Sequence, residues 1–360
     1  MKRLLITVLL ATASWPSFAN VNVMNFGADP TGGKLSNIAF NAALATGQCV
    51  YVPGGTYLLG PLALPTHACI TGDGMTSILR LADNSNADFI SLKTNTAEWV
   101  TLENLQINGH SSLQTRGACI NFANTLDRSA QQQASSISSQ DPRHNLKNLF
   151  LMSCKGDGID LTGGGGGGEV SGVRIWTVGG RGVYLTAPDY QFAQVDVGAT
   201  GAAGFFIAAG SAQMSNIKAW YTGYSNSAYR GAEGMGYFIT NGNADLSMSS
   251  VEAQDTGQEG FVLQNSEGAI ITGTVYDAGQ GARGVYSSVR IDGVNYNDVR
   301  VVIGHGDGLD GYAAYAATLP NGATGNRVTI SAKLARFSSG KFIDPASNTS
   351  TNYISIDQWH

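Results

Sequence analysis

The stretch G-D-G-I-D-L at residues 156–161 decides the fold, because five related stretches follow it along the chain. Each has a Gly at its third place, and the residues after that Gly alternate. Internal repeats of this length are typical of stacked units that cannot bury their apolar faces alone. The further copies are G-R-G-V-Y-L from 180, A-A-G-F-F-I from 202, G-M-G-Y-F-I from 234, Q-E-G-F-V-L from 258 and A-R-G-V-Y-S from 282.

A second alternating strand comes before each of the first five copies, as in L-F-L at 149–151 and V-R-I at 173–175. Two or three strands per turn, with glycine at a sharp corner, predict an all-β parallel solenoid of about ten coils. One residue of each copy then points into the rod. This inward column is predicted to be Ile159, Val183, Phe205, Tyr237, Phe261 and Val285.

Two outward rows of the same copies are candidates for chemistry. The place before the Gly holds Asp157, Arg181, Ala203, Met235, Glu259 and Arg283. This row predicts a groove in which a carboxylate lies beside an arginine that binds an acidic sugar, and the alternative is a plain ion pair between neighbouring coils. The second position after the Gly of each copy forms the other row, which holds Asp160, Tyr184, Phe206, Phe238, Val262 and Tyr286.

Aromatic rings in this second row predict a platform on which sugar rings stack. The alternative is that loops or a neighbouring subunit cover the rings. On the other strand, a row of alternating charge predicts a structural ladder of salt bridges, formed by Arg174, Asp196, Lys218 and Glu252.

Composition narrows the class of protein. The chain has 47 Gly among 360 residues, 13% charged residues and a net charge of -5, which suits strands joined by tight turns. Mild acidity without a basic cluster argues against nucleic acid as a partner.

The first residues predict export. Lys2 and Arg3 precede an apolar run at 4–13, and S-F-A at 17–19 fits a cleavage site, so residues 1–19 are predicted to be a signal peptide. The rival interpretation is a membrane anchor, although the run is shorter than the ~20 residues that span a bilayer. Residues 20–360 would then form a single secreted or periplasmic domain with no membrane span.

Four cysteines in a chain predicted to be exported favour disulfides. We favour Cys49 with Cys69 and Cys119 with Cys154, although four cysteines permit three pairings and free buried thiols are the alternative. The spacing does not match a zinc site.

The run V-M-N-F-G-A-D-P-T-G-G-K from residue 23 precedes a helix-like segment at 36–45, then C-V-Y-V-P-G-G-T-Y-L-L from 49 and I-T-G-D-G from 70. This order resembles the opening of the pectate-lyase superfamily, which includes polygalacturonase-like enzymes and tailspike depolymerases. The resemblance extends to about residue 339. It implies a right-handed parallel β-helix with an N-terminal capping helix.

Within that resemblance, K-G-D-G-I-D at 155–160 is similar to the N-T-D-G-I-D coil of polygalacturonase-like hydrolases, which implies a catalytic role for Asp157. Those enzymes carry Asp-Asp and Gly-His-Gly on the next two coils, whereas this chain has G-R at 180–181 and A-A at 202–203. Glycoside hydrolysis ordinarily needs two carboxyls. Asp160, Asp189 or Glu233 could supply the second, and the G-H-G at 304–306 lies too many coils away.

The sequence therefore predicts a secreted glycoside hydrolase or polysaccharide lyase with a polysaccharide substrate. Its predicted catalytic residues are Asp157, Asp160, Arg181 and Glu233, and its predicted substrate-binding residues are Tyr184, Phe206, Glu259 and Arg283. No metal site or cofactor is predicted, although the resemblance implies calcium if the protein is a lyase. The protein would be a monomer or a homotrimer. The alternative function is a non-catalytic glycan-binding or structural β-helix, such as an adhesin or a tailspike-like rod.

Overall fold

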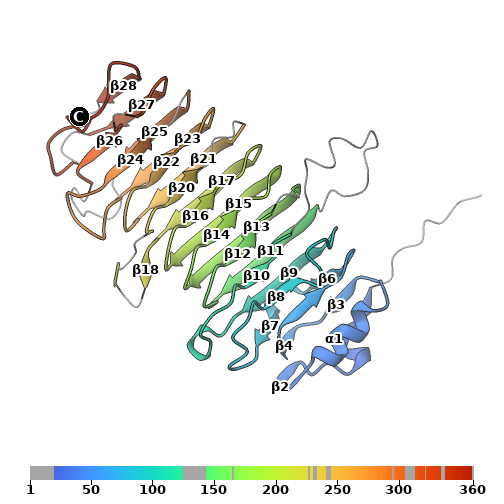
Figure 1. Cartoon of the computed structure of the whole chain (residues 1–360). Coiled ribbons are helices and arrows are strands. Elements are labelled where there is room, and N and C mark those ends of the chain that lie inside the picture. The colour runs from blue at the N-terminus through green and yellow to red at the C-terminus, as the bar shows by residue number, and fades with distance from the viewer. Residues whose placement is uncertain are drawn as a thin grey trace, which may run out of the picture.

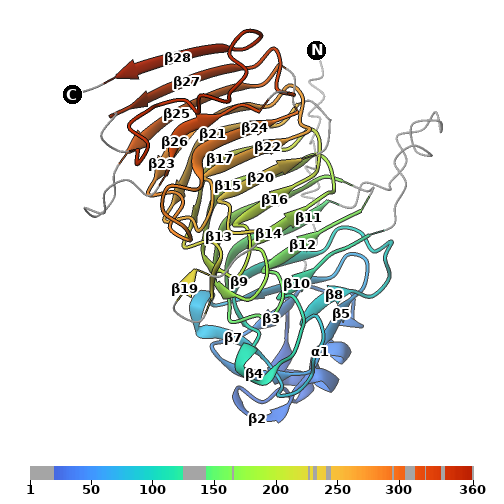
Figure 2. The same cartoon turned by 60° about the vertical axis from the view of Figure 1, so that its left-hand side comes forward.

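The computed structural model describes residues 20–124, 143–163, 166–225, 228–229, 233–240, 245–293, 296–304, 313–320, 322–333 and 337–358. The chain winds into a rod of stacked turns that runs from the blue end at α1 to the red end at β28 (Figures 1 and 2). This architecture confirms the predicted all-β parallel solenoid.

A ten-stranded sheet takes one short strand from each of ten successive turns, and every pairing in it is parallel. Its strands are β5 (Leu62–Leu64), β8 (Ile90–Leu92), β10 (Ile120–Asn121), β12 (Ile159–Leu161), β14 (Val183–Leu185), β16 (Phe205–Ile207), β20 (Tyr237–Thr240), β22 (Phe261–Gln264), β24 (Ser287–Asp292) and β26 (Tyr315–Thr318).

The rest of the wall is a 16-stranded sheet. Its strands are β1 (Val21–Asn22), β2 (Thr31–Leu35), β3 (Val50–Val52), β4 (Gly55–Leu59), β6 (Cys69–Gly72), β7 (Ser77–Leu81), β9 (Thr101–Asn108), β11 (His144–Met152), β13 (Gly168–Val178), β15 (Tyr190–Thr200), β17 (Gln213–Trp220), β21 (Ser247–Gln254), β23 (Ile270–Tyr276), β25 (Asp298–Gly304), β27 (Arg327–Ala332) and β28 (Tyr353–Gln358).

The smaller elements lie at the end and the edges of the rod. A two-stranded hairpin, β18 (Tyr224–Ser225) with β19 (Ala228–Tyr229), projects from its side (Figure 1). Three short 3-10 turns occur at Val23–Phe26, Gly74–Thr76 and Ser111–Leu113. The helix predicted over 36–45 is confirmed as α1 (Asn37–Leu44), which buries Phe40 with its ring centroid 5.8 Å from that of Tyr57. That α1 shields the end of the rod stays a prediction.

Each long central strand of the larger sheet bends near its middle at a residue in the left-handed conformation, and β13 and β15 have a second such residue near their ends, Thr177 and Ala199. Such a residue redirects the chain while the pairing on either side stays in register. The long strands thus each supply two sides of a turn, and the short strand supplies the third. The bend residues, with φ between 50° and 63°, are Asn104, Asn148, Gly172, Gln194, Asn216 and Ser250.

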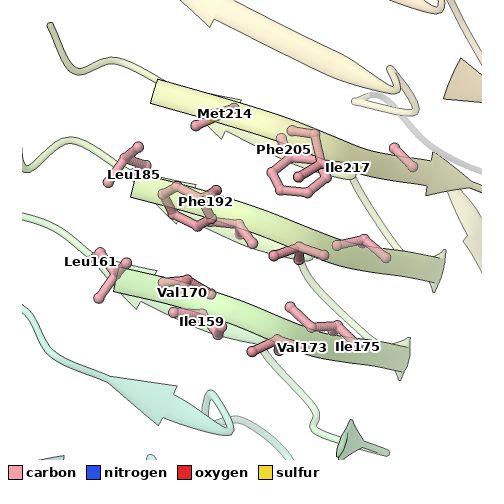
Figure 3. Close-up of a cluster of buried hydrophobic side chains, with 14 of the residues drawn as sticks. Ile159, Leu161, Val170, Val173, Ile175, Leu185, Phe192, Phe205, Met214 and Ile217 are labelled. Carbon is pink, nitrogen blue, oxygen red and sulfur yellow. The ribbon is translucent and has the colours of Figure 1, made fainter. Parts of the chain in front are cut away.

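The predicted inward column is confirmed for its first five members, which pair in register from β12 to β22 and are fully buried. The rings of Phe205, Tyr237 and Phe261 stack almost parallel, with centroids 5.1 and 4.8 Å apart. Figure 3 shows Ile159 and Phe205 among the aliphatic side chains of the facing strands. A continuous apolar core therefore holds successive turns together.

The prediction is wrong for the sixth member of that column, Val285. Phe261 pairs with Val289, whereas Val285 is 64% exposed. Residues 277–286 form consecutive turns, in which the N–H of Val285 bonds to the carbonyl of Ala282, so the apparent strand at 282–287 does not form at its first residues. The copy found in the sequence is therefore displaced by four residues from the true register.

In the first five copies the repeated Gly serves close packing rather than an unusual backbone angle, whereas Gly284 of the displaced copy has a φ of 75°. Gly158 and Gly182 lack a positive φ, but a Cβ at Gly182 would overlap the side chain of Val197 and the carbonyl of Gly204. The position demands the smallest residue because the facing strand approaches closely.

Both favoured disulfides are confirmed. Cys49 bonds to Cys69 and Cys119 bonds to Cys154, with Cα atoms 4.5 and 5.4 Å apart, and no free cysteine is found in the described chain.

The signal peptide predicted over 1–19 lies outside the described residues. Within the described segments, none of the helices has the length and apolar character needed to cross a bilayer.

The predicted salt-bridge ladder is confirmed on the outer face of the larger sheet. Arg174 pairs with Asp196 at 3.5 Å, and Lys218 pairs with Glu252 at 2.8 Å. All four side chains are partly exposed, so each pair contributes at most about 1 kcal/mol to folding.

A buried histidine predicts acid sensitivity. His144 is fully buried, and burial lowers its pKa to about 4 from its ordinary value of 6.5. Because the unfolded chain binds this proton more readily, His144 should reduce stability as the pH falls from 6.5 towards 4, by roughly 3 kcal/mol in all. We expect the free energy of unfolding of His144→Phe to vary less across that window.

The matched control is His67→Asn, since His67 is exposed. Urea unfolding at several pH values measures the effect. An equally steep pH dependence in wild type and His144→Phe would contradict it.

Candidate functional site

The candidate site lies on the outward face of the smaller sheet, where β12 and β14 begin. Ile159 and Leu161 of β12 point inward and are buried, so Asp160 between them points outward. Asp157 precedes the same strand through Gly158. The next coil brings Arg181 beside Asp157 and Tyr184 beside Asp160.

The Asp157 carboxylate is fixed by the neighbouring coil, because its Oδ1 accepts the backbone N–H of Arg181 at 2.6 Å. Burial raises the pKa of Asp157 most, and the charges of Glu233 and Asp88 raise it further. The N–H and the positive charge of Arg181 oppose this and favour the ionised form.

The Asp160 carboxyl has less support for a negative charge. Its Oδ1 is buried and has no hydrogen-bond partner among the described residues. Burial raises its pKa most, and the charges of Asp157 and Asp88 add to that, opposed by hydrogen bonding to Thr162. Burial thus raises the pKa of both carboxyls. Their surroundings differ because Asp157 accepts a backbone N–H from the next coil, whereas Asp160 Oδ1 has no hydrogen-bond partner within the described residues.

The sequence left open whether Arg181 lines a sugar-binding groove or only forms an ion pair with Asp157. The structure, which describes both side chains, does not show that ion pair. Arg181 Nη2 donates to Oε2 of Glu233 at 2.9 Å, and the guanidinium lies 4.6 Å from the ring centroids of both Tyr184 and Phe206. Glu233 reaches this point at the end of the insertion predicted over 221–233. The structure therefore brings together all four residues predicted to be catalytic.

The aromatic row exists but is not a bare platform. Tyr184, Phe206 and Phe238 are half-buried and form a continuous line, with successive ring centroids 5.1 and 5.0 Å apart. Arg181 covers part of the first two rings. The part of this row open to a sugar therefore lies mostly from Phe206 towards Phe238.

Sequence reasoning missed Asp88 and Asn121. Asp88 Oδ1 accepts the N–H of Ala118 and its Oδ2 accepts the side-chain amide of Asn121, each at 2.8 Å. Asn121 stands directly next to Asp160 in the sheet. These residues extend the polar part of the face by two coils.

The other candidate residues do not join this cluster. Arg283 is exposed on the turns that follow β23, off the row it was predicted to join, because of the register displacement in that coil. Glu259 is buried further along the same face. Asp189 lines a different cavity with Trp99 and Glu169, and His305 lies outside the described residues.

Metal ligands are not gathered here. Across the described ranges, no group of three or more His, Cys, Asp or Glu side chains could hold a metal ion.

Stacked parallel turns, carboxyls on the outward face of the short-stranded sheet and glycine-marked corners define a pectate-lyase-like right-handed parallel β-helix. The family model described as "Rhamnogalacturonase A/epimerase, pectate lyase-like" matches residues 20–283, and the chain belongs to this family. Comparison with curated proteins finds no match.

Solved structures share the fold at low sequence identity. The A-module of a mannuronan C-5 epimerase from Azotobacter vinelandii aligns with a TM-score of 0.71 and 12% identity over 95% of this chain and all (100%) of that one. The enzymatically active domain of tailspike protein 2 from bacteriophage CBA120 gives 0.70 and 16%, over 87% of this chain and 47% of that one. This chain therefore spans less than half of that tailspike domain.

A third structure is the catalytic unit of an alpha-1,3-glucanase from Streptomyces thermodiastaticus, with a TM-score of 0.52 and 17% identity over 97% of this chain and 69% of that one. Identities this low show the fold alone. The chemistry has to be argued from the side chains of this chain.

Proposed function

We propose that this protein is a polysaccharide-active enzyme that hydrolyses a glycosidic bond at Asp157 and Asp160. The observation that carries the proposal is a pair of buried carboxyls on one coil with different hydrogen bonding: Asp157 accepts the backbone N–H of Arg181, whereas Asp160 Oδ1 has no partner among the described residues. Pairs of this kind divide acid and base roles in glycoside hydrolysis. The kinds of protein named for the structural neighbours add support.

In this proposal Asp160 donates a proton to the oxygen of the leaving sugar. Its unpaired buried Oδ1 and the nearby anions favour the protonated form. Asp157, whose ionised form is favoured by the N–H and the positive charge of Arg181, acts as the base that activates water or as the nucleophile. Arg181 is a positioning residue whose N–H orients Asp157.

Hydrolysis fits the local charge better than elimination from an acidic sugar. The guanidinium of Arg181 is already paired with Glu233, and the carboxyls of Asp88, Asp157 and Asp160 lie close enough to one another for their charges to interact. A polyanionic chain would meet net negative charge at this point. We therefore propose a glycan whose residues at the cleaved bond are neutral.

Incubating the purified protein with neutral and acidic polysaccharides tests the function. Reducing ends released from a neutral glycan, without absorbance from unsaturated sugars, are the expected products. Unsaturated products would show elimination instead. Glycan binding without any product would favour the non-catalytic alternative, and either result overturns the proposal.

The pH profile should respond to Glu233. Its charge raises the pKa of Asp157, so Glu233→Gln should lower that pKa. Because a base works when deprotonated, the acidic limb of the kcat/KM profile should move to lower pH. The shift is measured by initial rates between about pH 3 and about pH 8, a range that includes the ordinary pKa values of carboxyl groups.

Glu252→Gln is the matched control, because it breaks an ion pair of similar length, 2.8 Å to Lys218, on the other sheet. An acidic limb that stays in place in Glu233→Gln, or moves equally in the control, would contradict the prediction.

Export to the cell surface, the periplasm or the medium is part of the proposal, supported by the two disulfides. We propose a monomer or a homotrimer. No step of the proposed hydrolysis uses calcium, which would matter only if the reaction were an elimination.

A further inference from the structure

The displaced coil at 277–286 builds a pocket on the same face as the candidate site. A cavity of about 320 Å³ lies over β20, β22 and β24, on the C-terminal side of the aromatic row. Its volume is at the small end of ligand pockets, which run from roughly 300 to 1,000 Å³. The pocket is thus sized for a small unit and not for a long segment of chain.

Its lining comes from three successive coils. The floor is the outward face of the sheet, where Phe238, Val262 and Arg290 stand in one register row. One wall is the turn that displaces the register, which raises Val285 and Tyr286 above the sheet. The remaining lining residues are Met235, Gln258, Glu259, Gln264 and Asp292.

Glu259 is the unusual group in this pocket. It is only 7% exposed, yet it lies at a cavity wall and plays no part in the proposed reaction. Burial raises its pKa most, which its own backbone hydrogen bond and the charge of Arg290 oppose. A buried carboxyl is costly for folding unless it is hydrogen-bonded or used.

The other polar groups are arranged as donors and acceptors at the rim. The Gln258 amide lies 3.5 Å from the Tyr286 hydroxyl, and Arg290 is paired with Asp292 at 2.9 Å. Because Arg290 is already paired with Asp292 and Glu259 adds a second carboxyl to the lining, the pocket does not match an anionic sugar. An aromatic ring beside several uncharged hydrogen-bonding groups suits a neutral one.

We propose that this pocket binds one neutral sugar residue, with Glu259 hydrogen-bonded to its hydroxyl groups and its apolar face against Phe238. The proposal rests on the proposed function, since the aromatic row runs from Tyr184 next to Asp160 directly to Phe238. From Asp160 to Val262 is four strands, or roughly 19 Å. The pocket therefore grips the same glycan at a distance from the cleaved bond and selects its composition there.

Calorimetric titration with D-glucose, D-galactose, D-mannose and N-acetyl-D-glucosamine tests the pocket, with D-glucuronate and D-galacturonate as acidic counterparts. At least one neutral sugar should bind to wild type, and neither acid should. Glu259→Gln keeps the shape of the side chain and should weaken binding about tenfold, as loss of a strong hydrogen bond does. Tyr286→Phe is the second variant and should also weaken it.

Glu267→Gln is the matched control, because Glu267 is exposed and lies outside the pocket. Binding of no neutral sugar, binding of the acids alone, or affinity that is unchanged in both Glu259→Gln and Tyr286→Phe would overturn the proposal. The same titrations with Asp157→Asn distinguish the proposed pocket from the proposed hydrolysis. Sugar binding that persists in this inactive variant supports the pocket. A wild-type protein that releases product but binds none of the neutral sugars refutes the pocket and leaves the hydrolysis standing.

Discussion

Asp157→Asn is expected to lower kcat/KM on a neutral polysaccharide by about two to four powers of ten, the range that acid and base groups contribute. The amide keeps the shape of the side chain and an oxygen that can accept the Arg181 N–H, now 2.6 Å from Oδ1. It cannot activate water or attack the sugar. The loss should therefore fall on the chemical step, and thermal unfolding should show an intact fold.

Asp189→Asn is the matched control, since Asp189 was a candidate second carboxyl but lines a different cavity. It should leave the rate unchanged. An Asp157→Asn protein that keeps more than half of the wild-type rate would remove Asp157 from the reaction. Equal losses in both variants would point to a general structural effect.

Tyr237→Ala is expected to destabilise the rod by roughly 3–5 kcal/mol, as other large-to-small changes of buried aromatic residues do. The Tyr237 ring is fully buried between Phe205 and Phe261, with centroids 5.1 and 4.8 Å away. Its removal leaves a cavity at the middle of the stack. Urea unfolding followed by circular dichroism measures the change.

Tyr237→Phe separates the ring from the hydroxyl, which donates to the carbonyls of Ile217 and Glu252 at 3.0 Å each. This variant should lose only about 1 kcal/mol. An alanine variant as stable as the phenylalanine variant would mean that the stacked column does not hold the turns together.

The coil repeat was predictable because each inward residue faces the same environment in successive turns. Periodicity therefore located Ile159 to Phe261 correctly. The prediction from periodicity is wrong for the copy that begins at residue 282. The sequence A-R-G-V-Y-S has the alternating pattern of a strand, but its first residues and the glycines before it form turns. Local pattern does not reveal that a coil is longer by four residues, and the pocket beside Glu259 arises from that extra length.

The candidate site was predictable where the glycine marker is present. Asp157 and Arg181 were found because Gly158 and Gly182 follow them. Asp88 occupies the equivalent place two coils before Asp157, but Phe89 and Cys119 stand where glycine would mark those coils. Only the register shows the equivalence.

The partners of Arg181 were not predictable either. Glu233 is 52 residues away, and its approach depends on the path of an insertion whose contacts are three-dimensional. The sequence could place Glu233 near the mouth of that insertion and no closer.

The most direct test of the central claim is a crystal structure of Asp157→Asn with a neutral oligosaccharide that the wild-type protein cleaves. We predict a glycan lying along the smaller sheet, with a glycosidic oxygen within hydrogen-bond reach of Asp160 and sugar rings against Phe206 and Phe238. A glycan bound on the larger sheet instead, or more than one coil away from Asp160, would contradict the account.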